Sequence, residues 1–409
     1  MRSLIFAAIA VLAACDASGQ GAPYVPGADR SWPTPPPNAH GQHPAFPGQT
    51  RAPAMHSQFT LHEQVVATHL ARPWAIAFLP DGRMLVTERV GRLRIVTPAG
   101  VVSQPLAGLP AVASTEQGGL LDVAVGPSFA ADHWIYWSYS EPREDGKNGT
   151  SVARAVLQED ASGARLANVQ VIFRQVPAWR SPTHFGSRLV FDGHNHLFIT
   201  LGERFTPESR QLAQTLDNDL GKVVRINPDG SIPADNPFVH QAGARPEIWN
   251  YGHRNMQGAD INPATGQLWT IEHGPMGGDE VNVARPGLNY GWPIITYGQD
   301  YDGTPIGAGI TQHAGMEQPL YYWDPVIAPS GSHFYRGNLF PAWRGDLLIG
   351  GLAAQALVRL KFNGERVVGE ERVLTDVGRV RDVAESADGA LWVVTDDDDG
   401  KLVRVTPAR

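Results

Sequence analysis

The chain has 409 residues and a formal net charge of -8 at pH 7 with no run of basic residues, which argues against a nucleic-acid partner. Its 44 glycines, 33 prolines and 11 tryptophans favour many short strands and tight turns over long helices. A chain of this length could hold two or three ordinary domains or one large repetitive all-β domain.

Residues 1–15 resemble a secretory signal of the bacterial lipoprotein type. Met1-Arg2 forms a short basic start, and residues 3–14 form an apolar run that is too short to span a bilayer as a finished helix. The run ends in Leu-Ala-Ala-Cys, which resembles the processing box in which the cysteine is lipidated. We therefore expect a periplasmic protein anchored to a membrane through Cys15, with a plain signal peptide cleaved nearby as the alternative. Cys15 is the only cysteine, so the chain cannot form an internal disulfide.

Residues 16–58 are dense in proline and polar side chains, a composition that neither pairs well in a sheet nor builds a core. We expect this segment to be a semi-extended tether between the anchor and a folded domain at residues 59–409. His40 and His43 in this segment are expected to be solvated and not to bind a metal.

From about residue 60 onward, a strand, a tight turn and a second strand recur. The turns carry pairs such as Asp81-Gly82, Asp192-Gly193 and Asp388-Gly389, which are typical of hairpins. Such units predict an all-β, six-bladed β-propeller, in which long loops between strands collect at one face and form the active site. A β-sandwich is the alternative, but the self-similarity argues against it. The units span residues 73–87, 119–137, 188–200, 258–271, 332–349 and 381–394.

Unusual residues are concentrated between Glu247 and Asp300. A cation and an amide stand together in Arg254-Asn255, and Gly274-Pro275 shortly precedes the paired carboxylates Asp279-Glu280. Exposed backbone carbonyls beside carboxylates are the ligand mixture that calcium prefers. An ordinary polar loop between strands is the alternative for any one of these motifs alone.

Two further groups indicate a general base and a site for an anionic partner. His184 precedes the first strand of the third unit, and Glu203, at the end of the next strand, could orient it as a general base. Arg379 and Arg381 point the same way from one strand and require an anion near the propeller axis. The alternatives are a structural histidine and surface salt bridges.

Taken together, these motifs resemble the soluble PQQ-dependent aldose sugar dehydrogenases, which include the soluble glucose dehydrogenases and are six-bladed propellers. The resemblance implies oxidation of aldose sugars at the anomeric carbon to lactones with PQQ and calcium, and transfer of electrons to a periplasmic acceptor. It runs from about residue 60 to the C-terminus and rests on motifs in the same order: Glu116-Gln117-Gly118-Gly119, His184, Gly252-His253-Arg254-Asn255, Gly274-Pro275 with Asp279-Glu280, Asn289-Tyr290-Gly291-Trp292-Pro293 and Arg379-Val380-Arg381-Asp382.

The resemblance also implies a role for each matching residue. His184 would take the proton of the anomeric hydroxyl, held by Glu203 where the family has an aspartate. Arg254 would stabilise negative charge on the quinone oxygens. The other implied cofactor contacts are Gln117, Asn255, Asp279, Arg379 and Arg381. The implied calcium ligands are the carbonyls of Gly274 and Pro275 beside the cofactor, and Glu280, Tyr290, Thr296, Asp300 and Glu317 at a second calcium site.

Two departures from the glucose enzymes concern substrate choice and cofactor affinity. Ala353 stands where those enzymes have a lysine, and residues 323–326 also differ, so the sequence is closer to the broad-specificity aldose branch. One alternative function is that of a calcium-dependent propeller hydrolase such as a lactonase, which would have no use for Arg379 and Arg381 facing Arg254. Another is a non-catalytic binding propeller. We expect a monomer or a homodimer.

Overall fold

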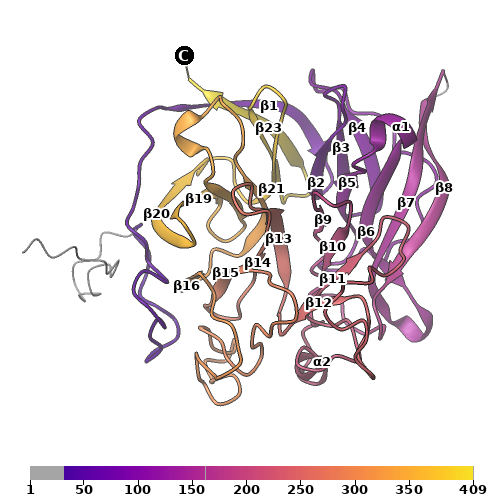
Figure 1. Ribbon diagram of the computed structural model, residues 1–409. Helices are drawn as coiled ribbons and strands as arrows, with labels where there is room; N and C mark the ends of the chain where they lie inside the picture. The colour runs from indigo at the N-terminus through magenta and orange to yellow at the C-terminus, as the bar shows by residue number, and fades with distance from the viewer. Residues whose placement is uncertain (1–31, 162, 409) are drawn as a thin grey trace, which may run out of the picture.

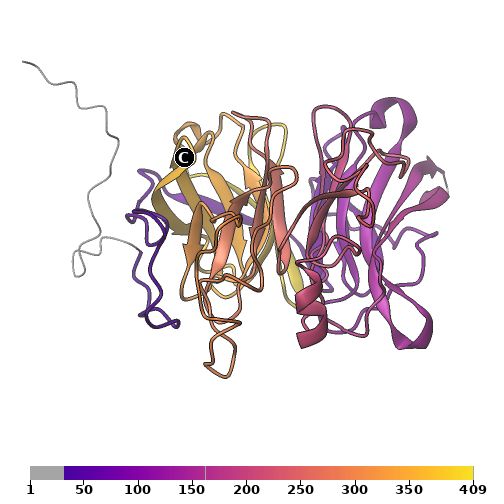
Figure 2. The same ribbon diagram turned by 60° about the horizontal axis from the view of Figure 1, so that its bottom comes forward.

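The computed structural model describes residues 32–161 and 163–408, in which six antiparallel sheets surround one axis (Figures 1 and 2). The prediction of an all-β, six-bladed propeller is confirmed. The first blade contains β2 (Pro73–Phe78), β3 (Met84–Glu88) and β4 (Arg92–Val96), and the second contains β5 (Leu120–Val125), β6 (Trp134–Pro142), β7 (Asn148–Asp160) and β8 (Gly163–Arg174). The third contains β9 (Leu189–Phe191), β10 (Leu197–Thr200), β11 (Lys222–Ile226) and β12 (Ile248–Tyr251), and the fourth contains β13 (Met256–Ile261), β14 (Leu268–Glu272), β15 (Asp279–Val283) and β16 (Tyr321–Trp323). The fifth contains β17 (Pro329–Phe334), β18 (Leu347–Gly351), β19 (Ala356–Asn363) and β20 (Arg366–Val373), and the sixth contains β21 (Val380–Glu385), β22 (Leu391–Thr395), β23 (Gly400–Pro407) and β1 (Leu61–Leu70).

The helical elements are short. They are α1 (Phe129–Asp132), α2 (Pro207–Leu212) and two 3-10 turns, η1 (Glu144–Gly146) and η2 (Pro341–Trp343). The first strands of successive blades contact one another in a closed ring, β2–β5–β9–β13–β17–β21–β2, so they line the axis. The last blade takes β1 from the start of the folded chain and pairs it with β23, with Leu61 opposite Pro407. This pairing closes the ring.

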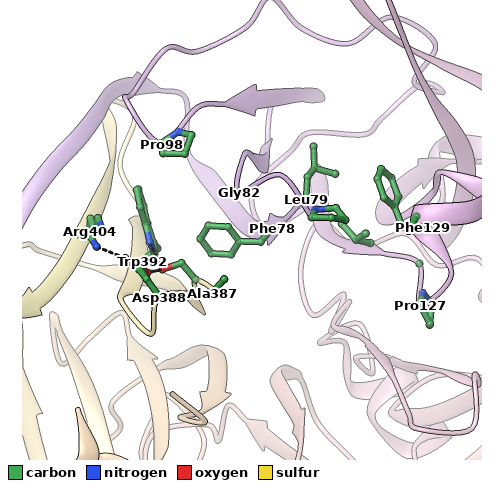
Figure 3. Close-up of a pocket in the computed structure, with 15 residues that line it drawn as sticks. Phe78, Leu79, Gly82, Pro98, Pro127, Phe129, Ala387, Asp388, Trp392 and Arg404 are labelled. Carbon is green, nitrogen blue, oxygen red and sulfur yellow. Dashed lines mark hydrogen bonds and ion pairs between the residues drawn. The ribbon is translucent and has the colours of Figure 1, made fainter. Parts of the chain in front are cut away.

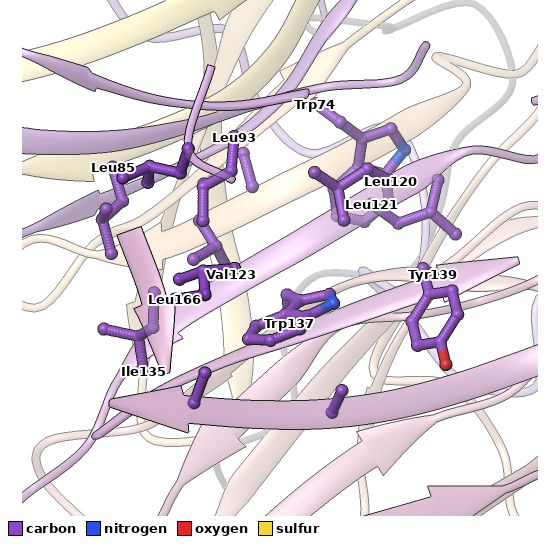
Figure 4. Close-up of a cluster of buried hydrophobic side chains, with 14 of the residues drawn as sticks. Trp74, Leu85, Leu93, Leu120, Leu121, Val123, Ile135, Trp137, Tyr139 and Leu166 are labelled. Atoms are coloured by element: carbon purple, nitrogen blue, oxygen red, sulfur yellow. The ribbon is translucent and has the colours of Figure 1, made fainter. Parts of the chain in front are cut away.

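Alternation along each strand distributes apolar side chains to the spaces between blades. In β6, Ile135, Trp137 and Tyr139 pack with the first blade, in a cluster that also contains Trp74 (Figure 4). Tyr136, between them in the sequence, packs with the third blade. Both faces of a blade are therefore covered, which explains why second strands such as β18 and β22 are continuous apolar runs, fully buried.

Buried ion pairs join the blades along the axis. The Arg188 guanidinium lies 2.9 Å from the Asp122 carboxylate and 3.2 Å from that of Asp382, which belong to the second and sixth blades. Asp382 also accepts a hydrogen bond from the amide of Ile76 in the first blade. These contacts join four blades at the axis.

Antiparallel blades separate their connections into two ends of the axis. The turns between first and second strands, with α1, lie at the upper end in Figure 1, and α2 lies at the lower end. The loops that enter each first strand, and those that join each second strand to the third, lie at this lower end, which we call the site face. The insertion at residues 284–320, between β15 and β16, also reaches the site face (Figure 2).

The segment expected to be a tether packs on the propeller wherever it is described. The amide of Met55 donates to the carbonyl of Glu370 in β20 at 2.7 Å, and Ala52 belongs to the core between the fourth and fifth blades. The amides of Asn38 and Ala39 each donate to the Asp324 carboxylate at 2.9 Å. The tether prediction is therefore wrong for residues 32–58, because alanines and backbone groups among the prolines find partners on the blades.

His40 and His43 are exposed, as expected for solvated side chains. Neither described range contains a helix with the length and apolar character needed to cross a membrane. The predicted signal and Cys15 lie outside the described residues.

Candidate active site

The predicted catalytic residues come from different blades and meet on the site face. Gln117 and His184 lie in the loops that enter β5 and β9, and Arg254 lies in the loop that enters β13. Gln117 accepts a hydrogen bond from the backbone amide of His184 at 2.9 Å. Asn255 accepts one from the amide of Gly186 at 3.0 Å. Loops distant in the sequence are thus fixed against one another around His184.

His184 forms a buried pair with Glu203, as predicted. Its Nδ1 lies 3.1 Å from the Glu203 Oε1, and the two side chains are 5% and 0% exposed. Burial, followed by the positive charge of Arg254, lowers the pKa of His184 to about 4, so the imidazole is neutral near pH 7. If Nδ1 carries the proton shared with the carboxylate, Nε2 is free to accept a proton from a substrate.

Glu203 stays ionised despite its burial. Burial acts to raise the pKa of Glu203, but His184, Arg254 and the amide of Phe205 together bring it below its ordinary value. The pair therefore consists of a neutral imidazole and a carboxylate, the arrangement of an oriented general base.

Arg254 lies beside this pair with part of its guanidinium unsatisfied. Its Nη1 donates to the carbonyls of Gly274 and His273 at 2.5 and 3.2 Å, and its Nη2 lies 3.3 Å from the Tyr301 hydroxyl. The buried Nε has no partner among the described residues. A buried donor without a partner is costly, which indicates room for an acceptor that the protein itself does not supply.

His273 is a site residue that the sequence motifs did not assign. Its buried Nε2 has no partner in the described part of the chain. Burial lowers the pKa of His273 well below its ordinary value, and Arg254, His184, Arg381 and Arg379 lower it further. These charges act together only because the fourth and sixth blades bring them to one place. The one available signal was its position immediately before Gly274-Pro275.

Arg379 and Arg381 share an anionic partner, as their spacing required. Each places Nη2 2.9 Å from the Asp396 Oδ2, in the loop after β22, and Arg89 lies 3.9 Å from the other oxygen. Burial acts to raise the pKa of Asp396, but these arginines bring it to about 2. Three guanidiniums therefore gather around one carboxylate, and Asp398 and Glu116 also act on Arg89.

The two arginines differ in their surroundings. Arg381 is buried and donates to the Gln257 side chain at 2.7 Å and to the Ser330 hydroxyl at 3.1 Å. Arg379 is 47% exposed and donates to the carbonyl of Leu352, next to the exposed Ala353. Of this pair, only Arg379 presents a large part of its side chain to a ligand.

Asp279 is held by backbone groups beside the site. Its fully buried carboxylate accepts from the amides of Gly274, Ile327 and Ala328, each at 2.8 Å. Burial raises the pKa of Asp279 to about 7. This residue holds the loop with Gly274 and Pro275 against the loop that enters β17. The loop is so tight that a Cβ on Gly274 would lie 2.3 Å from backbone atoms of Gly277 and Gly278.

Three of the five residues expected at the second calcium site, Glu280, Tyr290 and Thr296, line one small cavity together with Glu272. The cavity has a volume of about 10 Å³, which is enough for one water molecule or ion. Burial, and then the nearby Glu272 carboxylate, raises the pKa of Glu280 well above its ordinary value. Paired buried carboxylates of this kind fit a hard cation.

The other two predicted ligands do not line this cavity. Asp300 pairs with Arg210 at 3.0 Å, and the amide of Glu317 donates to the carbonyl of Asn289. The Tyr290 hydroxyl is also occupied, since it donates to the carbonyl of Val283 and accepts from the amide of Arg285. No cluster of three or more histidine, cysteine or carboxylate side chains suited to a metal occurs among residues 32–161 and 163–408.

A larger hollow lies at the opposite end of the axis and is separate from these residues. It has a volume of about 700 Å³ and is lined by apolar side chains that include Phe78, Phe129 and Trp392 (Figure 3). Its acidic and basic lining residues, Asp388 and Arg404, pair with each other at 2.5 Å. Because it lacks an oriented base or an unpaired cation, the site face is the better candidate for catalysis.

Comparison with known proteins agrees with this assignment. A family model described as glucose/sorbosone dehydrogenase matches residues 70–404. The chain is 46% identical over 351 residues to the aldose sugar dehydrogenase YliI of Escherichia coli (strain K12), covering 85% of this chain and 93% of that protein. A crystal structure of a glucose dehydrogenase is 47% identical, with a TM-score of 0.81, and the match covers 85% of this chain and all of the other. The PQQ-bound form of an aldose sugar dehydrogenase from Streptomyces coelicolor is 28% identical, with a TM-score of 0.69 and coverage of 86% and 100%.

Proposed function

Because the chain belongs to the glucose/sorbosone dehydrogenase family, we propose that it oxidises aldose sugars at the anomeric carbon to lactones, with PQQ and calcium as cofactors. The observation that carries the proposal is the oriented pair of His184 and Glu203 beside Arg254, together with the cations that gather around Asp396. The pair supplies a base, and the cations supply a site for an anionic cofactor.

The residues present suit PQQ, which is a quinone with three carboxylates. Arg89, Arg379 and Arg381 gather around the carboxylate of Asp396, and the positive charges of Arg254, Arg381 and Arg379 all lower the pKa of the buried His273. The unpartnered Nε atoms of Arg254 and Arg381 point to a missing acceptor. Arg379 and Arg254 would bind the cofactor through charge-assisted hydrogen bonds. The PQQ-bound relative from Streptomyces coelicolor supports the same choice.

Calcium is proposed at two places. The carbonyls of Gly274 and Pro275 would hold one ion beside the cofactor, and the Gly274 carbonyl already accepts from a cation, Arg254. Glu280, with Glu272 and Thr296, would hold a second ion in the small cavity. When bound, PQQ accepts the hydride and calcium acts as a Lewis acid.

In this proposal the protein moves one proton and stabilises one charge. Nε2 of the neutral His184 accepts the proton of the anomeric hydroxyl, and Glu203 orients the ring and stabilises the imidazolium. Arg254 would stabilise the negative charge that the hydride brings to the quinone oxygens. Gln117 fixes the His184 backbone, so the base keeps its position.

A calcium-dependent hydrolase is the competing function, since it would share the metal and the carboxylates. The cations around His273 argue against it, because a neutral lactone does not require them. Family membership favours an oxidoreductase over both a hydrolase and a non-catalytic propeller.

The test is a titration of purified protein with PQQ, with and without calcium, followed by aldose oxidation with an artificial electron acceptor. We expect a quinone absorption band and dehydrogenase activity that both require calcium. Lactone hydrolysis without PQQ, together with no sugar oxidation in its presence, would overturn the proposal.

We also propose that the protein is periplasmic, lipid-anchored through Cys15, a monomer or homodimer, and coupled to a periplasmic electron acceptor. The sequence of residues 1–15 supports the anchor. Mass spectrometry of the mature N-terminus tests it, because a lipidated Cys15 would be the first residue, whereas a plain signal peptide would leave an unmodified N-terminus.

A further inference from the structure

Two exposed aromatic rings lie beside the base on the site face. Phe205 is 37% exposed and Tyr301 is 58% exposed. Within the described ranges, Phe46 is the other aromatic residue among the large exposed hydrophobic side chains. Phe205 belongs to the loop after β10, and Tyr301 belongs to the insertion at residues 284–320. Two separate parts of the chain thus bring solvent-exposed rings to one place.

The rings surround the reacting groups at short distances. The Phe205 ring centroid is 4.8 Å from that of His184, with the planes at 59°, and 6.0 Å from that of Tyr301, with the planes at 67°. The Arg254 Cζ lies 5.9 Å from the Phe205 ring, and its Nη2 lies 3.3 Å from the Tyr301 hydroxyl. The rings therefore form a corner next to the base and next to the arginine.

The backbone that presents Phe205 is strained and firmly held. Arg204 and Phe205 have φ of +74° and +62°, a left-handed conformation that non-glycine residues rarely adopt. The Phe205 amide donates to the Glu203 carboxylate at 2.5 Å, and the buried Arg204 donates to Asn148 at 2.6 Å. The carboxylate that orients His184 therefore also fixes the position of the Phe205 ring.

Tyr301 is positioned by an ion pair at its neighbour. Asp300 lies 3.0 Å from Arg210, which follows Phe205 in the same loop of the third blade. The Asp300 amide also donates to the carbonyl of Thr304, which closes a turn around Tyr301. Asp300 therefore joins the insertion to the loop that carries Phe205.

We propose that Phe205 and Tyr301, the aromatic pair, bind the sugar by stacking on its C–H face and so determine which aldoses are oxidised. This inference rests on the proposed function. A pyranose with equatorial hydroxyls presents its axial C–H bonds as an apolar face, which fits the electron-rich face of an aromatic ring. Its polar edge then remains available to His184 and Arg254. An axial hydroxyl interrupts the face on which it lies, so stacking on the face that carries the axial C2–H and C4–H bonds favours D-glucose over D-galactose, whose 4-hydroxyl is axial on that face.

The test compares KM and kcat for D-glucose and D-galactose in variants of the aromatic pair. Tyr301→Ala removes one ring, and Phe205→Leu removes the other while keeping apolar volume. We expect each change to raise KM for D-glucose about tenfold, to lower kcat much less, and to reduce the preference for D-glucose over D-galactose. Since Tyr301 is exposed, its variant is expected to fold even if Phe205→Leu does not.

Two control variants separate stacking from other effects. Tyr301→Phe keeps the ring and should raise KM much less than Tyr301→Ala. Val65→Ala removes an exposed apolar side chain from β1, at the outer edge of the sixth blade, and should keep the parent KM. PQQ titration and the melting temperature of Tyr301→Ala should match those of the parent. Parent-like KM and sugar preference in both ring variants would overturn the inference alone. A parent protein that oxidises no aldose with PQQ and calcium would overturn the proposed function and this inference with it.

Discussion

At His184, burial and the charge of Arg254 oppose protonation while Glu203 holds the ring. Replacement by glutamine keeps a polar side chain of similar size but removes the base. We expect His184→Gln to lower kcat at saturating sugar by about 10²–10⁴. PQQ titration should be unchanged because the cofactor cations lie on other loops. If the variant keeps most of its turnover, the base is another residue, and His273 would be the first to examine.

The lowered pKa of His184 also predicts the pH dependence. The base acts in its neutral form, so kcat/KM should be constant from about pH 8 down to about pH 5 and fall as pH drops through about 4. An unperturbed histidine would cause the fall near pH 6.5. The measurement is kcat/KM against pH, with circular dichroism to confirm that the protein stays folded. A midpoint near 6.5 would mean that His184 is not the titrating base or is not desolvated.

Arg379 and Arg381 should differ when replaced by alanine. Arg379 is 47% exposed, so Arg379→Ala should weaken PQQ binding at least tenfold and leave the melting temperature near that of the parent. Arg381 is buried and joins Gln257, Ser330 and Asp396 across three blades, so Arg381→Ala should weaken binding and also lower the melting temperature. Equal melting temperatures, or parent-like titrations in both variants, would contradict this division.

Among the elements, we expect the insertion at residues 284–320 to depend most on a bound ion. If calcium occupies the cavity between Glu272 and Glu280, it stabilises the fold by about 2.7 kcal/mol at a hundredfold excess over its dissociation constant. A chelator should then lower the melting temperature of the parent, and Glu280→Gln should abolish that effect. Asp300→Asn is the matched control and should keep the effect, because Asp300 pairs with Arg210. A melting temperature that the chelator does not change would show that calcium does not bind in this cavity.

At the scale of the elements, most of the fold could be predicted from local sequence pattern. Alternation and turn signals, which include an Asp-Gly pair in three of the six blades, located the first two strands of the blades, because both depend on neighbouring residues. The packing of residues 32–58 could not be read in this way, since Ala52 and Asn38 depend on partners far along the chain.

From spacing and charge alone, the site could be predicted only where the interacting groups lie in one motif or on adjacent strands. His184 with Glu203 and Arg379 with Arg381 could be paired from spacing and charge. Asp279 looked like a ligand, but its carboxylate accepts hydrogen bonds from three backbone amides, which no sequence pattern reveals. Phe205 and Tyr301 belong to no motif, because they meet only when two blades are assembled.

For the whole molecule, the boundary of the folded unit lies before residue 59. A chain that begins at residue 59 loses the amides that bind Asp324, the bridge to Glu370 and the buried Ala52. At about 1 kcal/mol for each lost hydrogen bond, it should be less stable than a chain that begins at residue 32 by roughly 2–4 kcal/mol. Denaturant unfolding of the two chains measures the difference. The stability of a chain that begins at residue 45 should lie between those of the other two. Identical unfolding midpoints would show that residues 32–58 pack on the propeller without stabilising it.

The pairing of β1 with β23 has a consequence for the order of folding. Because Leu61 lies opposite Pro407, the sixth blade cannot be completed until nearly the whole chain has been synthesised. Non-local pairing of this kind is slow, since a long loop must close before any contact forms. Until then the edge of β23 is unpaired. The β1 strand of a second copy could pair with it, which would produce a domain-swapped dimer. The ends of the chain therefore determine how quickly, and with which partner, the ring closes.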